Sequence, residues 1–164
     1  MKLNISDFDK EILKHIIIEE TERDSIIRKL YQNTVDHKLV SEKDMPYYEE
    51  TLKMFDRKQT YFEQLINTLP NADQIETSNE EELNYICSLI ESQIEISRSR
   101  IEDFQPGQRI YERLAERTES KDEYEEGVTK IIQFENDCIN CCERLKTLIP
   151  EDDAREDAGL DKTL

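Results

Sequence analysis

Regular steps of four and three residues separate the apolar positions of residues 78–104. The apolar or small residues on these positions are Leu83, Cys87, Ile90, Ile94, Ser97, Ile101 and Phe104. Such steps keep the side chains on one narrow side of an α-helix. A helix with an apolar stripe needs partner helices that cover the stripe. This stretch therefore predicts a bundle of helices.

Three further segments carry the same kind of spacing and are expected to supply the partner helices. Each lies between a helix-start and a helix-stop signal, and the expected ranges are 7–39, 45–69 and 121–149. Pro46 falls in the first turn of its helix, where the missing N–H costs nothing. The chain has only three Gly and no Trp, which disfavours tight turns and strands. The predicted fold class is therefore all-α, an elongated antiparallel bundle of four main long helices.

Five pairs of residues resemble the capping box at the start of a helix. In a capping box, a hydroxyl side chain and an acid three positions later each accept a hydrogen bond from a backbone N–H. The pairs are Ser6–Asp9, Thr21–Asp24, Ser41–Asp44, Ser78–Glu81 and Ser120–Glu123. Four of the five pairs coincide with the start of an apolar period, which supports the expected helix starts.

The first helix contains a polar interval, residues 19–25, that leaves alternatives open. No Gly or Pro forces a break there, so one continuous helix is favoured over a break at Thr21. In a continuous helix, Glu20 and either Arg23 or Asp24 lie on the line that faces the core. Buried ions without a partner are costly. The interval therefore either faces water as a groove with acidic lips, which is favoured, or pairs Arg23 with acids inside the bundle.

The helix over residues 78–104 can be continued in register, although Pro106 and Gly107 interrupt it. A proline inside a helix removes one hydrogen bond and kinks the helix. Because the apolar register is kept, a kinked helix as far as Thr118 is favoured over a true break.

Two segments lack a periodic apolar face. Residues 71–77 are expected to form a loop, and residues 151–164 are expected to form an acidic, disordered tail. The remaining residues, 1–150, are expected to form a single helical-bundle domain.

The formal net charge of −17 restricts the partners of the chain. Residues 70–164 hold 25 acidic and 11 basic side chains, which gives −14 for this part. Such a charge repels phosphates, so direct binding to nucleic acid or to an anionic membrane is not expected. The chain shows no signal peptide and no apolar run long enough to span a membrane, which predicts a cytoplasmic, reducing location.

No arrangement of residues indicates a catalytic, cofactor or metal site, so we expect neither an enzyme nor a cofactor. Cys138, Cys141 and Cys142 share one helical face and could bind zinc, but a closed zinc site needs four ligands. Two of these cysteines fall on the apolar stripe, where a thiol packs as a small apolar side chain. The two histidines lack the Glu-x-x-His spacing of a di-metal bundle. Core packing is therefore favoured, and a metal-binding bundle is kept as a second alternative function.

Acidic side chains are the remaining functional signal. They gather before and at the start of the helix at 78–104, around the start of the helix at 121–149, and in the interval 19–25. The candidate partner-binding residues are Asp73, Glu76, Glu80, Glu81, Glu82, Glu119, Asp122, Glu123, Glu125, Glu126, Glu19, Glu20 and Glu22. Acids also stabilise the first turn of a helix, so solvation and complementation of the helix dipole are the competing interpretation.

These observations predict a protein-binding module, an adaptor or assembly subunit that acts through helical faces and an acidic surface. The partner is expected to be another protein with a basic surface. Two neighbouring apolar rows on the helix at 45–69 would also suit a homodimer. The alternative function is an acidic inhibitor that mimics nucleic acid and occupies the basic channel of a DNA- or RNA-binding protein.

Overall fold

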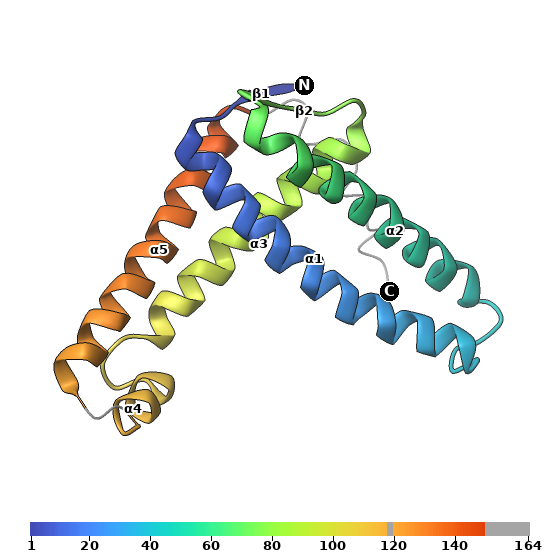
Figure 1. Cartoon of the computed structure of the whole chain (residues 1–164). Helices are drawn as coiled ribbons and strands as arrows, with labels where there is room; N and C mark the ends of the chain where they lie inside the picture. Colours follow the sequence, from blue (N-terminus) through green and yellow to red (C-terminus); the bar gives the residue numbers. More distant parts are fainter. Residues whose placement is uncertain (118–119, 150–164) are drawn as a thin grey trace. The chain divides into compact units, whose positions relative to one another are not determined.

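The computed structural model of the protein describes residues 1–117 and 120–149. These residues contain five α-helices, one 3₁₀ turn and two short strands, which confirms the predicted all-α fold class (Figure 1). The predicted helix end at Thr118 and the predicted tail at 151–164 lie outside the described residues. The chain divides into two compact units, Met1–Tyr85 and a second unit that begins at Ile86. The single domain over residues 1–150 stays a prediction, because two compact units can belong to one domain.

The first unit is built on two antiparallel helices, α1 and α2 (Figure 1). In chain order its elements are β1 (Lys2–Asn4), α1 (Asp7–Asp36), α2 (Met45–Thr68), the 3₁₀ turn (Leu69–Asn71), β2 (Gln74–Glu76) and the first turns of α3 (Glu80–Asp103). Arg28 of α1 pairs with Asp56 of α2 at 2.7 Å. Three residues further along α1, the ring centroids of Tyr31 and Phe55 lie 6.1 Å apart. These contacts define an α1–α2 hairpin, with its turn at residues 37–44.

α1 begins with the predicted capping box and runs without a break. The backbone N–H of Asp9 donates to Ser6 Oγ at 3.2 Å, and the backbone N–H of Ser6 donates to the Asp9 carboxylate at 2.6 Å. The alternative of a break at Thr21 is wrong, because the Thr21 hydroxyl donates to the carbonyl of Ile17 inside the helix at 2.8 Å. Thr21 and Asp24 therefore form no capping box, and the continuous helix is confirmed.

α1 ends at Asp36, three residues before its predicted end. The backbone N–H of Leu39 donates to the carbonyl of Thr34, and that of Lys38 donates to the carbonyl of Val35, which is the Schellman arrangement. Lys38 has a φ of 50°, a left-handed conformation that is usually taken by glycine. No glycine marks this helix end in the sequence, so the spacing alone placed the end too late.

At the starts of α2 and α3, the helix cap does not lie at the residue that the predicted capping box names. The Ser41 hydroxyl donates to the Asp44 carboxylate at 2.6 Å, but this pair closes a turn that precedes the start of α2. At the start of α3, the backbone N–H of Glu82 donates to Asn79 Oδ1 at 2.9 Å. Asn79 rather than Ser78 therefore caps α3, one position later than predicted.

The two short strands are the part of the first unit that the helical spacing did not predict. β1 and β2 pair antiparallel, with Leu3 opposite Ile75. Both of these side chains are buried, whereas their neighbours on each strand are exposed. The prediction of a loop over residues 71–77 is therefore wrong for Gln74–Glu76. An alternation of three residues is too short to distinguish a strand from a loop in a sequence.

The second unit contains the rest of α3, the short α4 (Arg109–Ala115) and α5 (Lys121–Thr147). The favoured prediction of one kinked helix is wrong, because α3 ends at Asp103 and α4 is a separate helix. Pro106 has no N–H to donate, and Gly107 has a φ of 88°, which a right-handed helix does not contain. The alternative of a true break is confirmed.

α5 starts after its predicted cap and buries the predicted cysteines. The backbone N–H of Glu123 donates to Ser120 Oγ at 3.4 Å. Cys138, Cys141 and Cys142 are buried. All four cysteines of the chain lie in the described part, and none of them forms a disulfide. Among the described residues, no group of three or more His, Cys, Asp or Glu side chains is arranged to hold a metal ion.

Alkylation of the native protein with iodoacetamide is expected to modify Cys87 long before Cys142. The thiolate is the reacting form, and burial raises the pKa of Cys142 to about 12, from an ordinary value of 9.0. Cys87 is only half-buried, although burial raises its pKa as well. Mass spectrometry of peptides sampled over time gives the two rates, and unfolding in urea should make them similar. Equal rates in the native protein would contradict the burial of Cys142.

Candidate functional site

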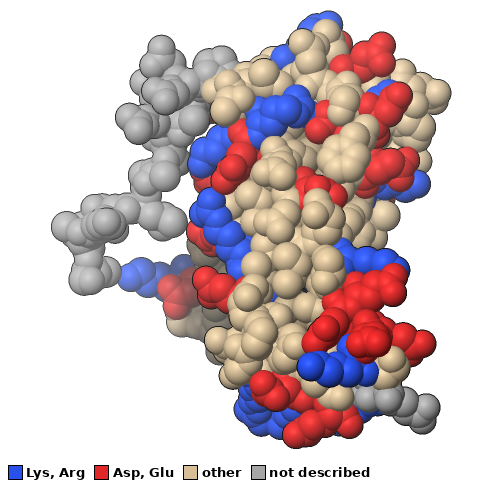
Figure 2. Space-filling model, turned by 90° about the vertical axis from the view of Figure 1, so that its left-hand side faces the viewer, with Lys and Arg blue, Asp and Glu red and all other residues tan. Residues whose placement is uncertain are grey.

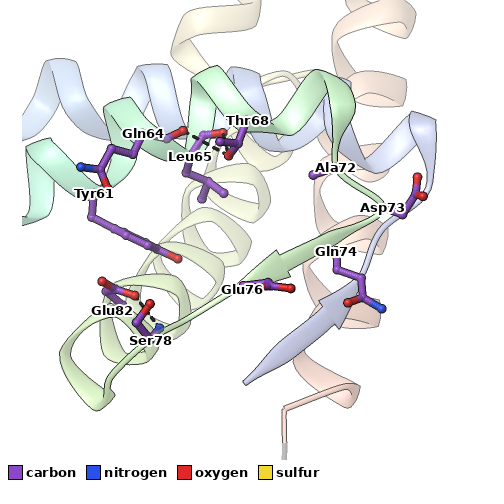
Figure 3. Close-up of a pocket in the computed structure, with 10 residues that line it drawn as sticks. All are labelled: Tyr61, Gln64, Leu65, Thr68, Ala72, Asp73, Gln74, Glu76, Ser78 and Glu82. Carbon is purple, nitrogen blue, oxygen red and sulfur yellow. Dashed lines mark hydrogen bonds between the residues drawn. The ribbon is translucent and has the colours of Figure 1, made fainter.

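An open groove of about 610 Å³ lies beside β2 in the first unit (Figure 3). The last turns of α2 form one wall, and β2 with the start of α3 forms the other. Three of its lining residues, Asp73, Glu76 and Glu82, belong to the predicted partner-binding residues. This groove is therefore the candidate functional site.

Local structure explains why acidic side chains reach the groove. In β2, Gln74 and Glu76 lie on one side of the strand and Ile75 is buried on the other. At the start of α3, the Glu82 carboxylate accepts a hydrogen bond from the backbone N–H of Ser78 at 2.6 Å (Figure 3). This bond holds Glu82 at the edge of the groove.

Tyr61 gives the groove a polar group without a partner. Its hydroxyl oxygen is buried and has no hydrogen-bond partner among the described residues. The ring reaches into the groove on the side of Ser78 and Glu82 (Figure 3). Burial, together with the charge of Glu82, raises the pKa of Tyr61, so the hydroxyl stays protonated at neutral pH. It can then donate one hydrogen bond and accept others.

Two of the groove acids have basic neighbours from the beginning of the chain. Lys2 pairs with Glu76 at 2.6 Å, and Lys10 lies 3.8 Å from Asp73. The hydrogen bond from Lys2 lowers the pKa of Glu76, so this carboxylate is ionised at neutral pH. The Lys2–Glu76 pair is exposed on both sides, and exposed ion pairs of this kind contribute little to stability. The groove therefore presents carboxylates that another cation can take over.

The structure does not bring Glu80 or Glu81 into the lining of the groove. Glu80 is exposed in the first turn of α3. Glu81 accepts hydrogen bonds from the Tyr85 hydroxyl at 2.7 Å and from Arg57 at 2.9 Å, and these bonds lower its pKa. Of the acids in the first turn of α3, Glu81 therefore has a basic neighbour, Arg57 of α2.

The predicted acids at the start of α5 lie in the second unit. The exposed ones are Asp122, Glu123, Glu125 and Glu126. Lys121 lies 3.4 Å from the Glu125 carboxylate, and Lys130 lies 2.6 Å from that of Glu126. The predicted site residue Glu119 lies outside the described residues.

The polar interval of α1 forms a buried cluster of ion pairs. Glu20 is only 6% exposed, and its carboxylate accepts hydrogen bonds from Arg23 and from Lys58 of α2, both at 2.6 Å. Lys58 also pairs with Asp24 at 2.8 Å, and burial raises the pKa of Asp24. The favoured prediction of an open groove with acidic lips is therefore wrong. The alternative of internal pairing by Arg23 is correct, with Lys58 as a second base.

The three predicted site residues of this interval differ in exposure. Glu20 is buried in the cluster, Glu19 is half-buried at 3.4 Å from the His15 imidazole, and Glu22 is exposed. The sequence contained one overlooked signal, a lysine at position 58, three residues after Phe55 and four before Phe62. A base in an apolar row predicts an acid opposite it.

Acidic and basic side chains are interspersed on the face drawn in Figure 2, and neither sign covers that face alone. The pairs of Lys2, Lys10 and Arg57 with acids describe the same mixture in the first unit. The net charge of −17 is therefore not presented as one continuous acidic surface on this face.

No protein family, curated protein or solved structure matches this chain. None of the helices in the described residues is both long and apolar enough to span a membrane. The function is therefore inferred from the geometry of the groove.

Proposed function

We propose that the protein is a protein-binding module whose groove takes a basic segment of its partner. The observation that carries this proposal is the arrangement of three carboxylates, those of Asp73, Glu76 and Glu82, around a groove that also holds the unpartnered hydroxyl of Tyr61. The volume of about 610 Å³ is in the usual range of ligand pockets.

The chemistry of the lining suits a lysine or arginine side chain. The aliphatic stem of such a side chain packs against Leu65 and the Tyr61 ring, while its charged end reaches the carboxylates. Charge-assisted hydrogen bonds to carboxylates are the stronger kind. The oxygen of Tyr61 is buried, so it can accept a further hydrogen bond from the same cation only when binding exposes it. Lys2 then releases its exposed pair with Glu76 to the incoming base.

The interspersed bases favour this module over an inhibitor that mimics nucleic acid. A mimic needs a row of negative charges that are free to face a basic channel. In the first unit, Lys2, Lys10 and Arg57 each lie within 4 Å of a predicted site residue: Lys2 lies 2.6 Å from Glu76, for example. Recognition of a short basic segment in one groove requires only the three lining acids.

The double substitution Asp73→Asn and Glu76→Gln is expected to weaken binding of a basic peptide about tenfold, because both carboxylates lose their charge. The probes are short fluorescein-labelled peptides rich in Lys or in Arg, with an acidic peptide as the negative probe. Fluorescence anisotropy gives the dissociation constants.

The matched control is Asp122→Asn with Glu123→Gln, which changes the net charge equally in the second unit. The control should leave peptide binding unchanged. An equal loss of affinity in both variants would show that binding depends on the net charge of the chain and not on the groove. Tyr61→Phe should weaken binding without lowering the melting temperature, because its hydroxyl has no partner to lose. Failure of every basic peptide to bind would contradict the proposal.

A further inference from the structure

Large apolar side chains are exposed on the part of the α1–α2 hairpin that lies nearest its turn. Ile26 is 62% exposed, Leu30 61% and Tyr47 64%. Ile27 and Met54 are exposed as well. We name these five residues the distal patch. Single exposed apolar residues are common, but a group on neighbouring turns of two packed helices marks an interaction surface.

The members of the distal patch lie on one side of the hairpin. The reference point is the Glu20 carboxylate, where Arg23 of α1 and Lys58 of α2 meet. On α1, the patch residues follow Arg23 by three, four and seven positions. On α2, the patch residues precede Lys58 by four and eleven positions. Each of these steps returns to the same side of a helix.

The first turns of α3, which belong to the first unit, contact the same side of the hairpin at its other end. Tyr61 follows Met54 by seven positions and contacts Tyr85, with ring centroids 6.2 Å apart. Arg57 pairs with Glu81 at 2.9 Å. Towards the turn at residues 37–44 the side chains on this side are exposed. The distal patch is therefore a place where two helices present an apolar side for further helices to cover.

The segment that carries the distal patch differs from the rest of the chain in its net charge. Residues 26–55 contain five basic and five acidic side chains: Arg28, Lys29, Lys38, Lys43 and Lys53 against Asp36, Glu42, Asp44, Glu49 and Glu50. The net charge of this segment is zero, so the other residues carry the whole −17. Two copies of the chain repel each other where both carry a net negative charge, but the segment at residues 26–55 is neutral and adds no such repulsion.

We propose that the distal patch is a homodimer interface, covered by the same patch of a second copy. Packing one hairpin on another buries both patches and forms a four-helix arrangement. A two-fold axis places the same surface on both sides of the contact, which a locally neutral and apolar surface tolerates. The interface leaves the groove beside β2 free, so dimerisation would present two grooves to a partner.

The double substitution Ile26→Gln and Leu30→Gln tests this interface without changing the charge. Sedimentation of the full chain over about 1 to about 200 µM should show association towards twice the chain mass of 19.5 kDa for the unsubstituted protein. The variant should dimerise about tenfold more weakly, because it loses apolar area on both sides of the contact. Raising the salt from about 0.05 to about 0.5 M should not weaken the dimer, because the interface is neutral.

The matched control is Ile18→Gln, which removes an exposed apolar side chain of α1 about two turns before the distal patch. Tyr47→Gln provides a second variant on α2, and circular dichroism verifies that each variant folds. An unsubstituted protein that stays monomeric over the whole range would overturn the proposal. An equal loss with Ile18→Gln, or no loss with the patch variants, would place the contact elsewhere.

Discussion

Replacing Lys58 by Met is expected to lower the free energy of unfolding by about 3 kcal/mol, because it leaves a buried carboxylate short of a partner. Glu20 is 6% exposed, and Lys58 Nζ lies 2.6 Å from one of its carboxylate oxygens. Lys58 also pairs with Asp24, so both acids lose a base. Met keeps an unbranched apolar side chain, but it loses the ammonium that lies over the Phe62 ring, 5.6 Å from the ring centroid. Urea unfolding followed by circular dichroism measures the loss.

The control for this prediction is Lys53→Met on the same helix. Lys53 is exposed and lies 3.4 Å from the exposed Glu50, so its removal should change the free energy of unfolding by less than about 1 kcal/mol. Adding Glu20→Gln to Lys58→Met should recover part of the loss, because the buried charge is removed together with its partner. Equal losses for Lys53→Met and Lys58→Met would contradict the buried cluster.

The loss caused by Lys58→Met is expected to shrink on acidification. Burial raises the pKa of Asp24, so the folded protein takes up this proton at a higher pH than the unfolded chain does. The stability that this group provides is therefore present at low pH and is lost as the pH rises through its folded pKa. Without Lys58, protonation also neutralises a charge that has lost its base. Unfolding at about pH 7 and about pH 5 gives the comparison.

Replacing Arg100 by Met is expected to cost about 3 kcal/mol in the second unit, for the same physical reason. Glu135 of α5 is 4% exposed and lies 3.1 Å from Arg100 of α3. The Ser97 hydroxyl donates to the other carboxylate oxygen at 2.6 Å, and Gln93 donates to Ser97 at 3.0 Å. Within this network, the loss of Arg100 leaves the Glu135 carboxylate with uncharged partners alone. Urea unfolding again gives the change.

Arg98 provides a closely matched control, two residues earlier on α3. It pairs with Glu143 of α5 at 3.0 Å, but both side chains are exposed. Arg98→Met should therefore change the free energy of unfolding by less than about 1 kcal/mol. If both variants lost the same amount, burial of Glu135 would not be the cause.

The helices were predictable because the residues that define them are close together in the sequence. Phe55, Phe62 and Leu65 follow one another by seven and three positions, and all three are buried. The hydroxyl of Ser120 caps α5 at the predicted residue. The break after α3 was visible at Pro106 and Gly107, but the preserved apolar register beyond it favoured the wrong alternative.

Contacts between distant parts of the chain were not predictable from spacing. The partner of Glu20 is Lys58, 38 positions away, and no local pattern connects the two residues. The groove was not predictable for the same reason, because its walls come from distant parts of the chain. Asp73 and Glu76 were recognised as acids, but the wall that they form depends on the pairing of β2 with β1. The sequence shows Tyr61 only as an aromatic residue of the helix at 45–69, and its unpartnered hydroxyl becomes visible in three dimensions.

The pairing of β1 with β2 has a consequence for the order in which the first unit folds. Asn4 and Gln74 are register partners 70 positions apart, and closing so long a loop in an unfolded chain is entropically costly for a ladder of three residues. α1 and α2 lie between the strands, and their antiparallel packing brings the two ends of this loop together. We therefore expect the ladder to form after the hairpin, and we expect a change that separates α1 from α2 to release β1 as well.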